Sequence, residues 1–252
     1  MEIVDINFWV LVLVGIAAQL IDGSLGMAYG VSSNSFLLGV GVPPAIASAS
    51  VHTAEVFTTA ISGFSHWKLG NIDKRIVFGL LIPGMIGGAL GAYVLTSVDG
   101  NKIKPYIAIY LLLMGIRILY KAFTHKEQLD KEPNPSLMIP LGLAGGTMDA
   151  MGGGGWGPIV TSTLISSGHT PRKTIGSVNF SEFFVTVVEA ITFLLTLGFQ
   201  HWNVILGLML GGVIAAPFGA LLTKKIPAKY IMLVVGSLII FLQVRTLLQI
   251  WG

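Results

Sequence analysis

Three long apolar stretches are the feature of this sequence that most limits its possible folds. Residues 76–97 and 203–222 contain no charged side chain, and residues 228–249 contain only Lys229 and Arg245. Each stretch approaches the length of about 20 residues that a helix needs to cross the roughly 30 Å hydrocarbon core of a bilayer. Only 11% of the 252 residues are charged, whereas about 25% is usual in a soluble domain, so the surface requires lipid around it. We therefore predict an all-α fold, a polytopic bundle of transmembrane helices.

The second half of the sequence resembles the first half. A shift of 127 residues places Asp22 on Asp149 and Pro44 on Pro171. The same shift aligns Gly26 with Gly153, Tyr29 with Trp156, Gly30 with Gly157, Ser50 with Ser177, Val51 with Val178 and Glu55 with Glu182. Chance matches of apolar residues are frequent in a membrane protein, whereas acidic residues and prolines that match at one offset are not. We predict two repeats, residues 1–123 and 136–252, joined by a hydrophilic linker at residues 124–135.

Each repeat has the same predicted order of segments. Two short apolar segments flank a glycine-rich break, at about 6–21 and 28–40, then at 137–148 and 155–167. Three longer helices follow, at about 44–65, 76–97 and 103–122, then at 172–198, 203–222 and 228–249. Because most of the short segments cannot span a bilayer comfortably, each pair is predicted to form a broken or re-entrant hairpin.

The basic residues predict how the repeats are oriented. Lys68, Lys74 and Arg75 follow the first long helix of repeat one, whereas Arg172 and Lys173 precede the first long helix of repeat two. These loops flank opposite ends of equivalent spans, so the repeats are expected to be antiparallel. With the basic loops and the linker in the cytoplasm, both termini lie outside, in a multi-pass protein of the cell (inner) membrane. This orientation leaves three basic residues outside: Lys102, Lys104 and Arg245.

Antiparallel repeats with broken helices are typical of secondary transporters whose site lies near the bilayer midplane. The alternative is a scaffold or assembly protein that has merely duplicated. An enzyme is disfavoured because the chain has no cysteine and no recognisable Ser-His-Asp arrangement, and no metal or other cofactor is expected. The net charge of +3 arises in short loops, so nucleic acid is not an expected partner. The expected partners are a small anion and the lipid bilayer, with monomer and homodimer both left open.

The two breaks are candidate anion sites. Glycines there leave backbone N–H groups approachable, and a helix that starts after them favours negative charge. On this interpretation Ser24, Gly26, Gly153 and Gly154 contact the anion. In the alternative, Asp22 and Asp149 are helix caps and the glycines serve only packing. Both interpretations of the aspartates remain open.

Hydroxyl and amide side chains near the breaks and on the first long helices could also bind an oxyanion. The candidates are Ser33, Asn34, Ser50, Thr161, Ser162, Ser177 and Asn179. The alternative is ordinary hydrogen bonding between helices, worth about 0.6 kcal/mol for each bond.

Ionisable residues within the first long helix of each repeat are candidates for proton coupling. His52 and Glu55 are three residues apart and share a helix face, and Asn179 and Glu182 occupy the matching positions. Ionisable groups inside a membrane are costly and usually functional, so His52, Glu55 and Glu182 are predicted to carry protons. The alternative, solvation near the membrane surface, is disfavoured for Glu55, which lies about halfway along its helix. Glu189 is expected on the same helix as Glu182, one face further on.

Arg117 and Lys121 lie near the inner end of the 103–122 helix. Their side chains are expected to extend to the inner membrane surface. A role of Arg117 in substrate binding is the alternative.

The order of these motifs resembles the sulfite exporter TauE/SafE family. The matching motif is an acidic residue before a glycine-rich break, followed by a proline and then by small residues. In repeat one these are Asp22 to Gly30, Pro44 and residues 47–50, and in repeat two they are Asp149 to Gly157, Pro171 and Gly176-Ser177. The Gly-Asn-Ile-Asp run at 70–73 also matches. The resemblance spans essentially the whole chain and implies transport of sulfite or of C2 and C3 sulfonates such as sulfoacetate. His52 and Glu55 depart from the commonest family pattern. The resulting prediction is a secondary transporter, an exporter of small sulfur anions, with proton coupling as a further hypothesis and a passive anion channel as the alternative.

Overall fold

The computed structural model describes residues 6–25, 27–124, 134–198, 201–225 and 228–251. All regular elements within these ranges are helical. The first repeat contains α1 (Phe8–Leu25), α2 (Tyr29–Gly39), α3 (Pro44–Lys68), α4 (Lys74–Ser97) and α5 (Gly100–Phe123). The second contains α6 (Pro135–Gly152), a π-helix (Trp156–Thr161), α7 (Ser162–Ser166), α8 (Pro171–Leu197), α9 (Trp202–Lys225) and α10 (Ala228–Trp251). Most of the predicted linker lies outside the described residues.

Four helices in the described part of the chain are long and apolar enough to cross a membrane: α4, α5, α8 and residues Met232–Trp251 of α10. Two further apolar helical stretches, Phe8–Gly23 and Trp202–Ala216, are shorter. These spans confirm the predicted all-α membrane bundle. Helix α3 has 25 residues but is more polar, because it contains His52, Glu55 and several hydroxyl residues.

The first helix of each hairpin is longer than predicted, at 18 residues in both α1 and α6. Helix α6 continues through Asp149 and ends at Gly152, because the next residue, Gly153, has a left-handed φ of 65° that stops the helix. The second helix of each hairpin is short: α2 has 11 residues, and in the other hairpin a π-helix precedes the five residues of α7. The glycines therefore mark the far end of the first helix rather than a break around the aspartate.

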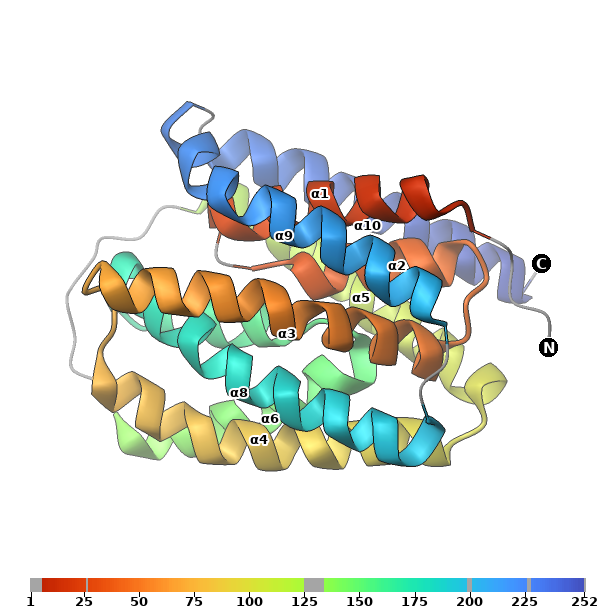
Figure 1. Ribbon diagram of the computed structural model, residues 1–252, viewed down its shortest axis with the longest axis horizontal. Coiled ribbons are helices and arrows are strands. Elements are labelled where there is room, and N and C mark those ends of the chain that lie inside the picture. Colours follow the sequence, from red (N-terminus) through yellow and green to blue (C-terminus); the bar gives the residue numbers. More distant parts are fainter. Residues whose placement is uncertain (1–5, 26, 125–133, 199–200, 226–227, 252) are drawn as a thin grey trace.

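The two hairpins enter the bundle from opposite ends (Figure 1). Helices α1 and α3 begin at the end where α10 finishes, whereas α6 and α8 begin at the other end. Hydrogen bonds fix both ends: Asn203 donates to the Ile6 carbonyl at one, and Arg172 donates to the Asn71 side chain at 2.6 Å at the other. Each hairpin thus leaves the bundle at the end where it entered.

The central pair of helices is α3 and α8, which pack on each other, while α1 packs along α9, α4 along α6 and α5 along α10. The outer surface is apolar. On α4, for example, Phe78, Ile82, Ile86 and Leu90 recur every four residues and are all at least half exposed. In contrast, His52 and Glu189 in the centre are fully buried. Apolar residues outside and ionisable residues inside are the pattern expected of a bundle surrounded by lipid.

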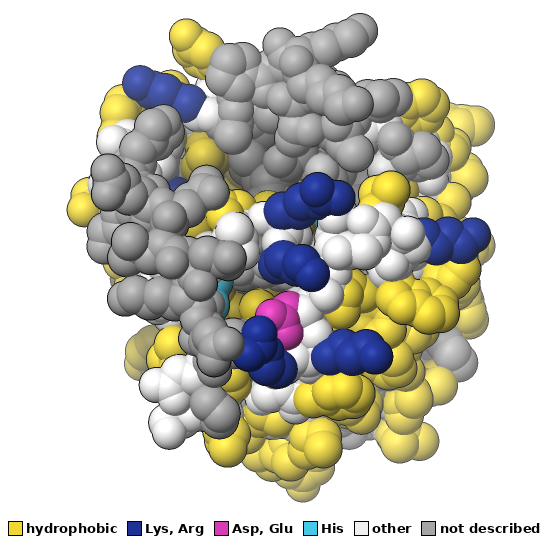
Figure 2. All heavy atoms as spheres, turned by 90° about the vertical axis from the view of Figure 1, so that its left-hand side faces the viewer, with side chains coloured by type: hydrophobic (Ala, Val, Ile, Leu, Met, Phe, Trp, Pro, Cys, Tyr) yellow, Lys and Arg dark blue, Asp and Glu magenta, His cyan; other side chains and the backbone are white. Residues whose placement is uncertain are grey.

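One end of the bundle is basic. Figure 2 shows Lys and Arg side chains gathered on this face, with acidic colour beside them. The helix ends that meet there carry Lys68, Lys74, Arg75, Arg172 and Lys173. This is the end at which α3 finishes and α8 begins (Figure 1).

Candidate functional site

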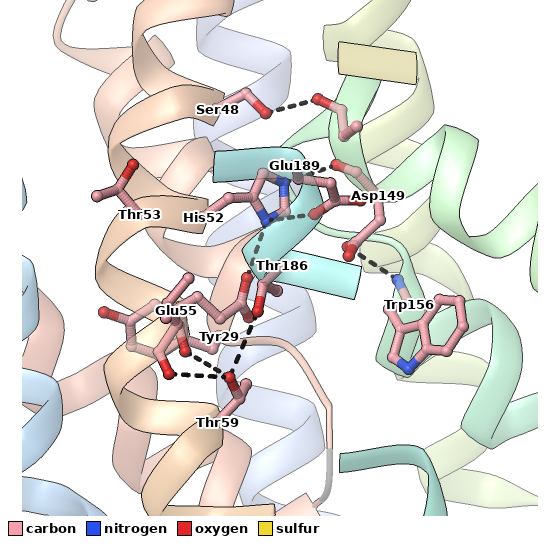
Figure 3. A network of polar contacts seen from close by, with 12 residues as sticks. Tyr29, Ser48, His52, Thr53, Glu55, Thr59, Asp149, Trp156, Thr186 and Glu189 are labelled. Carbon is pink, nitrogen blue, oxygen red and sulfur yellow. Dashed lines mark hydrogen bonds and ion pairs between the residues drawn. The ribbon is translucent and has the colours of Figure 1, made fainter. Parts of the chain in front are cut away.

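A histidine between two glutamates forms the centre of the site (Figure 3). His52 of α3 places Nδ1 3.0 Å from Glu55 Oε2 on the same helix and 3.1 Å from Glu189 Oε2 on α8. Its other ring nitrogen, Nε2, lies 3.0 Å from the Asp149 carbonyl. Phe193 stacks on the imidazole with an interplanar angle of 5°, which fixes the ring plane.

These contacts determine where protons must be. A carbonyl only accepts, so Nε2 carries a proton and donates it to Asp149. Nδ1 faces two carboxylates, so a second proton lies between Nδ1 and one of the glutamates, held either by the imidazole or by a carboxyl group. The His52–Glu55–Glu189 triad can therefore store a proton and pass it from one carboxylate to the other.

Asp149 organises the break of the second hairpin. Its Oδ1 accepts hydrogen bonds from the backbone amides of Gly155 at 2.6 Å and Trp156 at 2.9 Å. Its carbonyl accepts from Gly153 and Gly154. The amides of residues 153–156 thus have partners within the protein, so the predicted anion site at this break lacks free donors.

Asp22 has a similar place in the first hairpin, where its carboxylate interacts with the backbone amide of Tyr29. Tyr29 matches Trp156 in the repeat alignment. Both aspartates therefore act as caps for the helix that follows the break, as in the alternative interpretation of the sequence.

The two hairpins cross each other at their glycines. A Cβ on Gly30 would lie 2.7 Å from the Gly153 carbonyl oxygen, and one on Gly154 would lie 2.0 Å from the Val31 nitrogen. The Asn34 side chain, one turn along α2, donates to the Gly152 carbonyl and ties the breaks together. Backbone contacts this close require glycine on both sides.

A small polar cavity lies between the crossing hairpins and the central helices. Three carboxylates line it: Glu55, Asp149 and Glu182. The rest of the wall consists largely of residues from the two breaks, including Tyr29, Gly30 and Gly154. The cavity is therefore acidic, and it joins the two repeats.

The other predicted residues lie in several places. Ser50 lines a second pocket between α3 and α8. Ser177 accepts a hydrogen bond from the Asp73 amide at the basic end, outside the central cavity. Ser162 lies beside Lys121 and Met27, and Thr161 is fully buried in the π-helix. Ser33 and Asn179 are buried on α2 and α8. Gly26 and the Ser24 side chain lie outside the described residues.

Sequence reasoning omitted Glu189 from the proton-carrying set. Glu189 follows Glu182 by seven residues, close to two full turns, so the two share a face of α8. That spacing is the signal that could have identified it. The contact with His52 depends on how α3 and α8 pack, which the sequence does not specify.

The same centre contains the one described group with spacing suited to a metal ion, since ligand atoms of His52, Asp149 and Glu189 lie within 4.8 Å of one another. A metal bound there would have to displace the hydrogen bonds that the two ring nitrogens of His52 make with Glu55 and with the Asp149 carbonyl.

Comparison with known proteins identifies the family. The profile described as sulfite exporter TauE/SafE matches residues 11–246, nearly the whole chain. The chain belongs to the TauE/SafE family. It is similar to a probable membrane transporter protein, YtnM, of Bacillus subtilis (strain 168), with 48% identity over 96% of this chain and 83% of that protein. A second protein of the same organism, the probable membrane transporter protein YunE, is 21% identical over 94% of this chain and 96% of its own length. No solved structure matches.

Membership confirms the resemblance seen in the sequence and makes the chain a multi-pass membrane transporter of a family named for sulfur-anion export. The family is one of transporters by name, not of enzymes. The acidic cavity and the His52 triad therefore lie inside a transport protein, between its two halves.

Proposed function

We propose that this TauE/SafE protein is a proton-coupled secondary transporter that exports sulfite or small organosulfonates such as sulfoacetate. The family name supports the substrate class. The observation that carries the mechanism is the buried His52 shared by Glu55 and Glu189 next to a carboxylate-lined cavity. Such a cluster is costly inside a membrane and is best explained by protons that move during transport.

The proposed transporter consists of two inverted repeats related by a pseudo-two-fold axis. Thr59 and Thr186 occupy equivalent positions, and their hydroxyl oxygens lie 3.5 Å apart where α3 crosses α8. Equivalent residues meet each other only at a symmetry axis. The hairpin contacts are also reciprocal: Trp156 packs on Gly84 of α4, and Tyr29 packs on Gly212 of α9, the matching glycine.

Several predicted substrate contacts have unused hydrogen-bonding capacity. Ser33 Oγ, Asn34 Oδ1 and Asn179 Oδ1 are buried and have no hydrogen-bond partner among the described residues. Buried polar atoms without partners are rare and call for an explanation. We propose that a translocating anion, with its hydration water, supplies these partners as it passes between the repeats.

Glu55→Gln tests the proton coupling. The substitution keeps the shape of the side chain and removes its titration, so one of the two proton acceptors of His52 is lost. Sulfite flux in proteoliposomes with an imposed pH gradient should lose its dependence on that gradient. The control is Glu2→Gln, at an acidic residue far from the centre in sequence. Gradient-driven flux that is unchanged in Glu55→Gln contradicts the proton-carrying role.

A passive anion channel is the alternative function. It would dissipate a sulfite gradient but could not accumulate sulfite against one. Concentrative flux driven by a proton gradient in wild-type proteoliposomes separates the two. We favour transport because the backbones of the two hairpins cross in close contact and leave little space between them.

The proposed orientation places the basic end in the cytoplasm and both termini outside. The chain has no cysteine, so single substitutions to cysteine give unambiguous labels. In intact cells, Lys102→Cys should react with a membrane-impermeant maleimide, whereas Lys74→Cys should react only after the cells are opened. The opposite pattern of labelling would reverse the orientation.

A further inference from the structure

A cationic pocket lies at the basic end of the bundle, separate from the carboxylate-lined centre. It lies between the last turns of α5 and the short helix α7. Its lining includes Arg117, Tyr120 and Lys121 of α5 and the hydroxyl residues Ser162 and Ser166 of α7. This is the end that faces the viewer in Figure 2.

The two cations in the pocket contact neutral groups only. Arg117 Nη2 lies 3.3 Å from Thr163 Oγ1, and Lys121 Nζ lies 3.4 Å from Ser162 Oγ. No carboxylate in the described part of the chain forms an ion pair with either one. Like charges four residues apart on a helix repel each other, so the pair is unfavourable until an anion compensates it.

Lys121 also connects the two hairpins. Its Nζ lies 3.9 Å from the Met27 sulfur, next to the break of the first hairpin. Ser162, its partner on the second hairpin, lies 3.8 Å from the same sulfur atom. An anion held by Lys121 would therefore sit at the junction of the two elements that line the transport path.

The centre of the protein has the opposite charge. Glu55, Asp149 and Glu182 line the cavity there, and an oxyanion among them would be repelled unless protons neutralise them. An anion is therefore attracted more strongly at a cationic position away from these carboxylates, and the Arg117–Lys121 pocket has that charge.

We infer that the Arg117–Lys121 pocket is an oxyanion-binding site that receives the transported sulfur anion from the basic side of the membrane. The guanidinium and ammonium groups bind the anion's oxygens through charge-assisted hydrogen bonds, and the hydroxyls of Ser162 and Thr163 complete the site. This inference rests on the proposed function, because it assigns that function's substrate to a particular site.

Radiolabelled sulfite binding to the full chain in phosphatidylcholine nanodiscs tests the site. Arg117→Gln and Lys121→Gln should each weaken sulfite binding by roughly tenfold or more, because each removes one charge-assisted partner. Arg117→Lys and Lys121→Arg should retain most of the affinity, which excludes misfolding as the cause. The matched control is Lys74→Gln, which removes one charge from an exposed position at the same end and should bind sulfite like the wild type.

A lipid headgroup carries the same oxyanion chemistry as sulfite, so a second measurement tests which of the two the pocket binds. Native mass spectrometry compares how much phosphatidylglycerol stays bound to the wild type and to the double variant after both are released from nanodiscs that contain this lipid. If the Arg117→Gln/Lys121→Gln variant loses bound phosphatidylglycerol but keeps its sulfite affinity, the pocket is a headgroup site and the inference is overturned. Unchanged sulfite binding in the double variant, or no sulfite binding by the wild type, overturns it as well.

Flux through the wild-type protein in proteoliposomes distinguishes this inference from the proposed function. If the wild type transports sulfite and the double variant binds sulfite as well as the wild type does, only the assignment of the anion to this pocket is overturned. Sulfite binding that depends on the pocket without any flux overturns only the transport proposal.

Discussion

Gly154→Ala should prevent this protein from forming its native crossing of hairpins. Gly154 has a φ of 153°, a conformation that residues with a Cβ rarely adopt. The added methyl would also lie 2.0 Å from the Val31 nitrogen and 2.4 Å from the Gly30 carbonyl carbon, both of them backbone atoms of the other hairpin. Side chains can rotate away from a clash, whereas the backbones of two packed hairpins cannot.

We expect this substitution to destabilise the protein by about 3 kcal/mol or more, from backbone strain and overpacking together. For a chain of this length, that corresponds to a fall in Tm of roughly 6–12 °C. Sulfite transport should also be lost, because the glycine crossing forms one wall of the central cavity. Thermal unfolding in detergent and flux in proteoliposomes measure the two effects.

Gly39→Ala is the matched control. Gly39 belongs to α2, the helix that Gly154 contacts, but an added Cβ there meets only Leu242 Cδ2 at 3.6 Å, an ordinary distance. Alanine should be tolerated or slightly stabilising at this helical position. If Gly154→Ala unfolds and transports like Gly39→Ala, the hairpins do not cross as described.

The sequence predicted the long helices well because lipid imposes a simple rule on them. Uncharged stretches such as residues 76–97 must be helical to satisfy their backbone groups in hydrocarbon, and α4 begins at Lys74 and ends at Ser97. The hairpins were predicted less well. Glycine at position 152 suggested a break, yet α6 continues to it, because Asp149 caps the following segment and Gly153 is the residue that turns.

The site was predicted by residue type rather than by contact. His52 and Glu55 share a helix, so their spacing alone placed them together. Glu189 joins them from α8, and the Lys121 ammonium meets Ser162 from α7. Contacts of this kind depend on the angle and register between helices. Helix packing sets both, and local sequence pattern does not encode them.

His52→Gln should abolish proton coupling and destabilise the protein. Without the imidazole, the fully buried Glu189 and the nearly buried Glu55 lose the group that holds the proton between them. Breaking a buried pair by removing one partner costs about 3–5 kcal/mol. Glutamine keeps some of the packing against Phe193 but cannot exchange a proton, so flux should no longer respond to an imposed pH gradient.

The loss of stability in His52→Gln should grow as the pH rises. In acidic buffer both glutamates of His52→Gln can be neutral and remain buried at little cost. As the pH rises, the unfolded chain releases these protons while the folded protein must retain them, so the variant's Tm should fall more steeply than that of the wild type. A His52→Gln protein whose Tm follows the wild type from acidic to alkaline buffer would show that the imidazole holds no proton for these carboxylates.

A second substitution separates charge from packing. His52→Gln/Glu189→Gln removes the imidazole together with one of the two carboxylates it joins, so only Glu55 of the triad still has to be kept neutral. The double variant should therefore recover part of the lost Tm, most visibly in alkaline buffer, because the two positions interact directly and their effects should not add. Coupled flux should stay absent, since Glu55 alone cannot pass a proton between α3 and α8. Recovery of stability without recovery of coupling would assign the triad to the proton path rather than to the packing of the central helices.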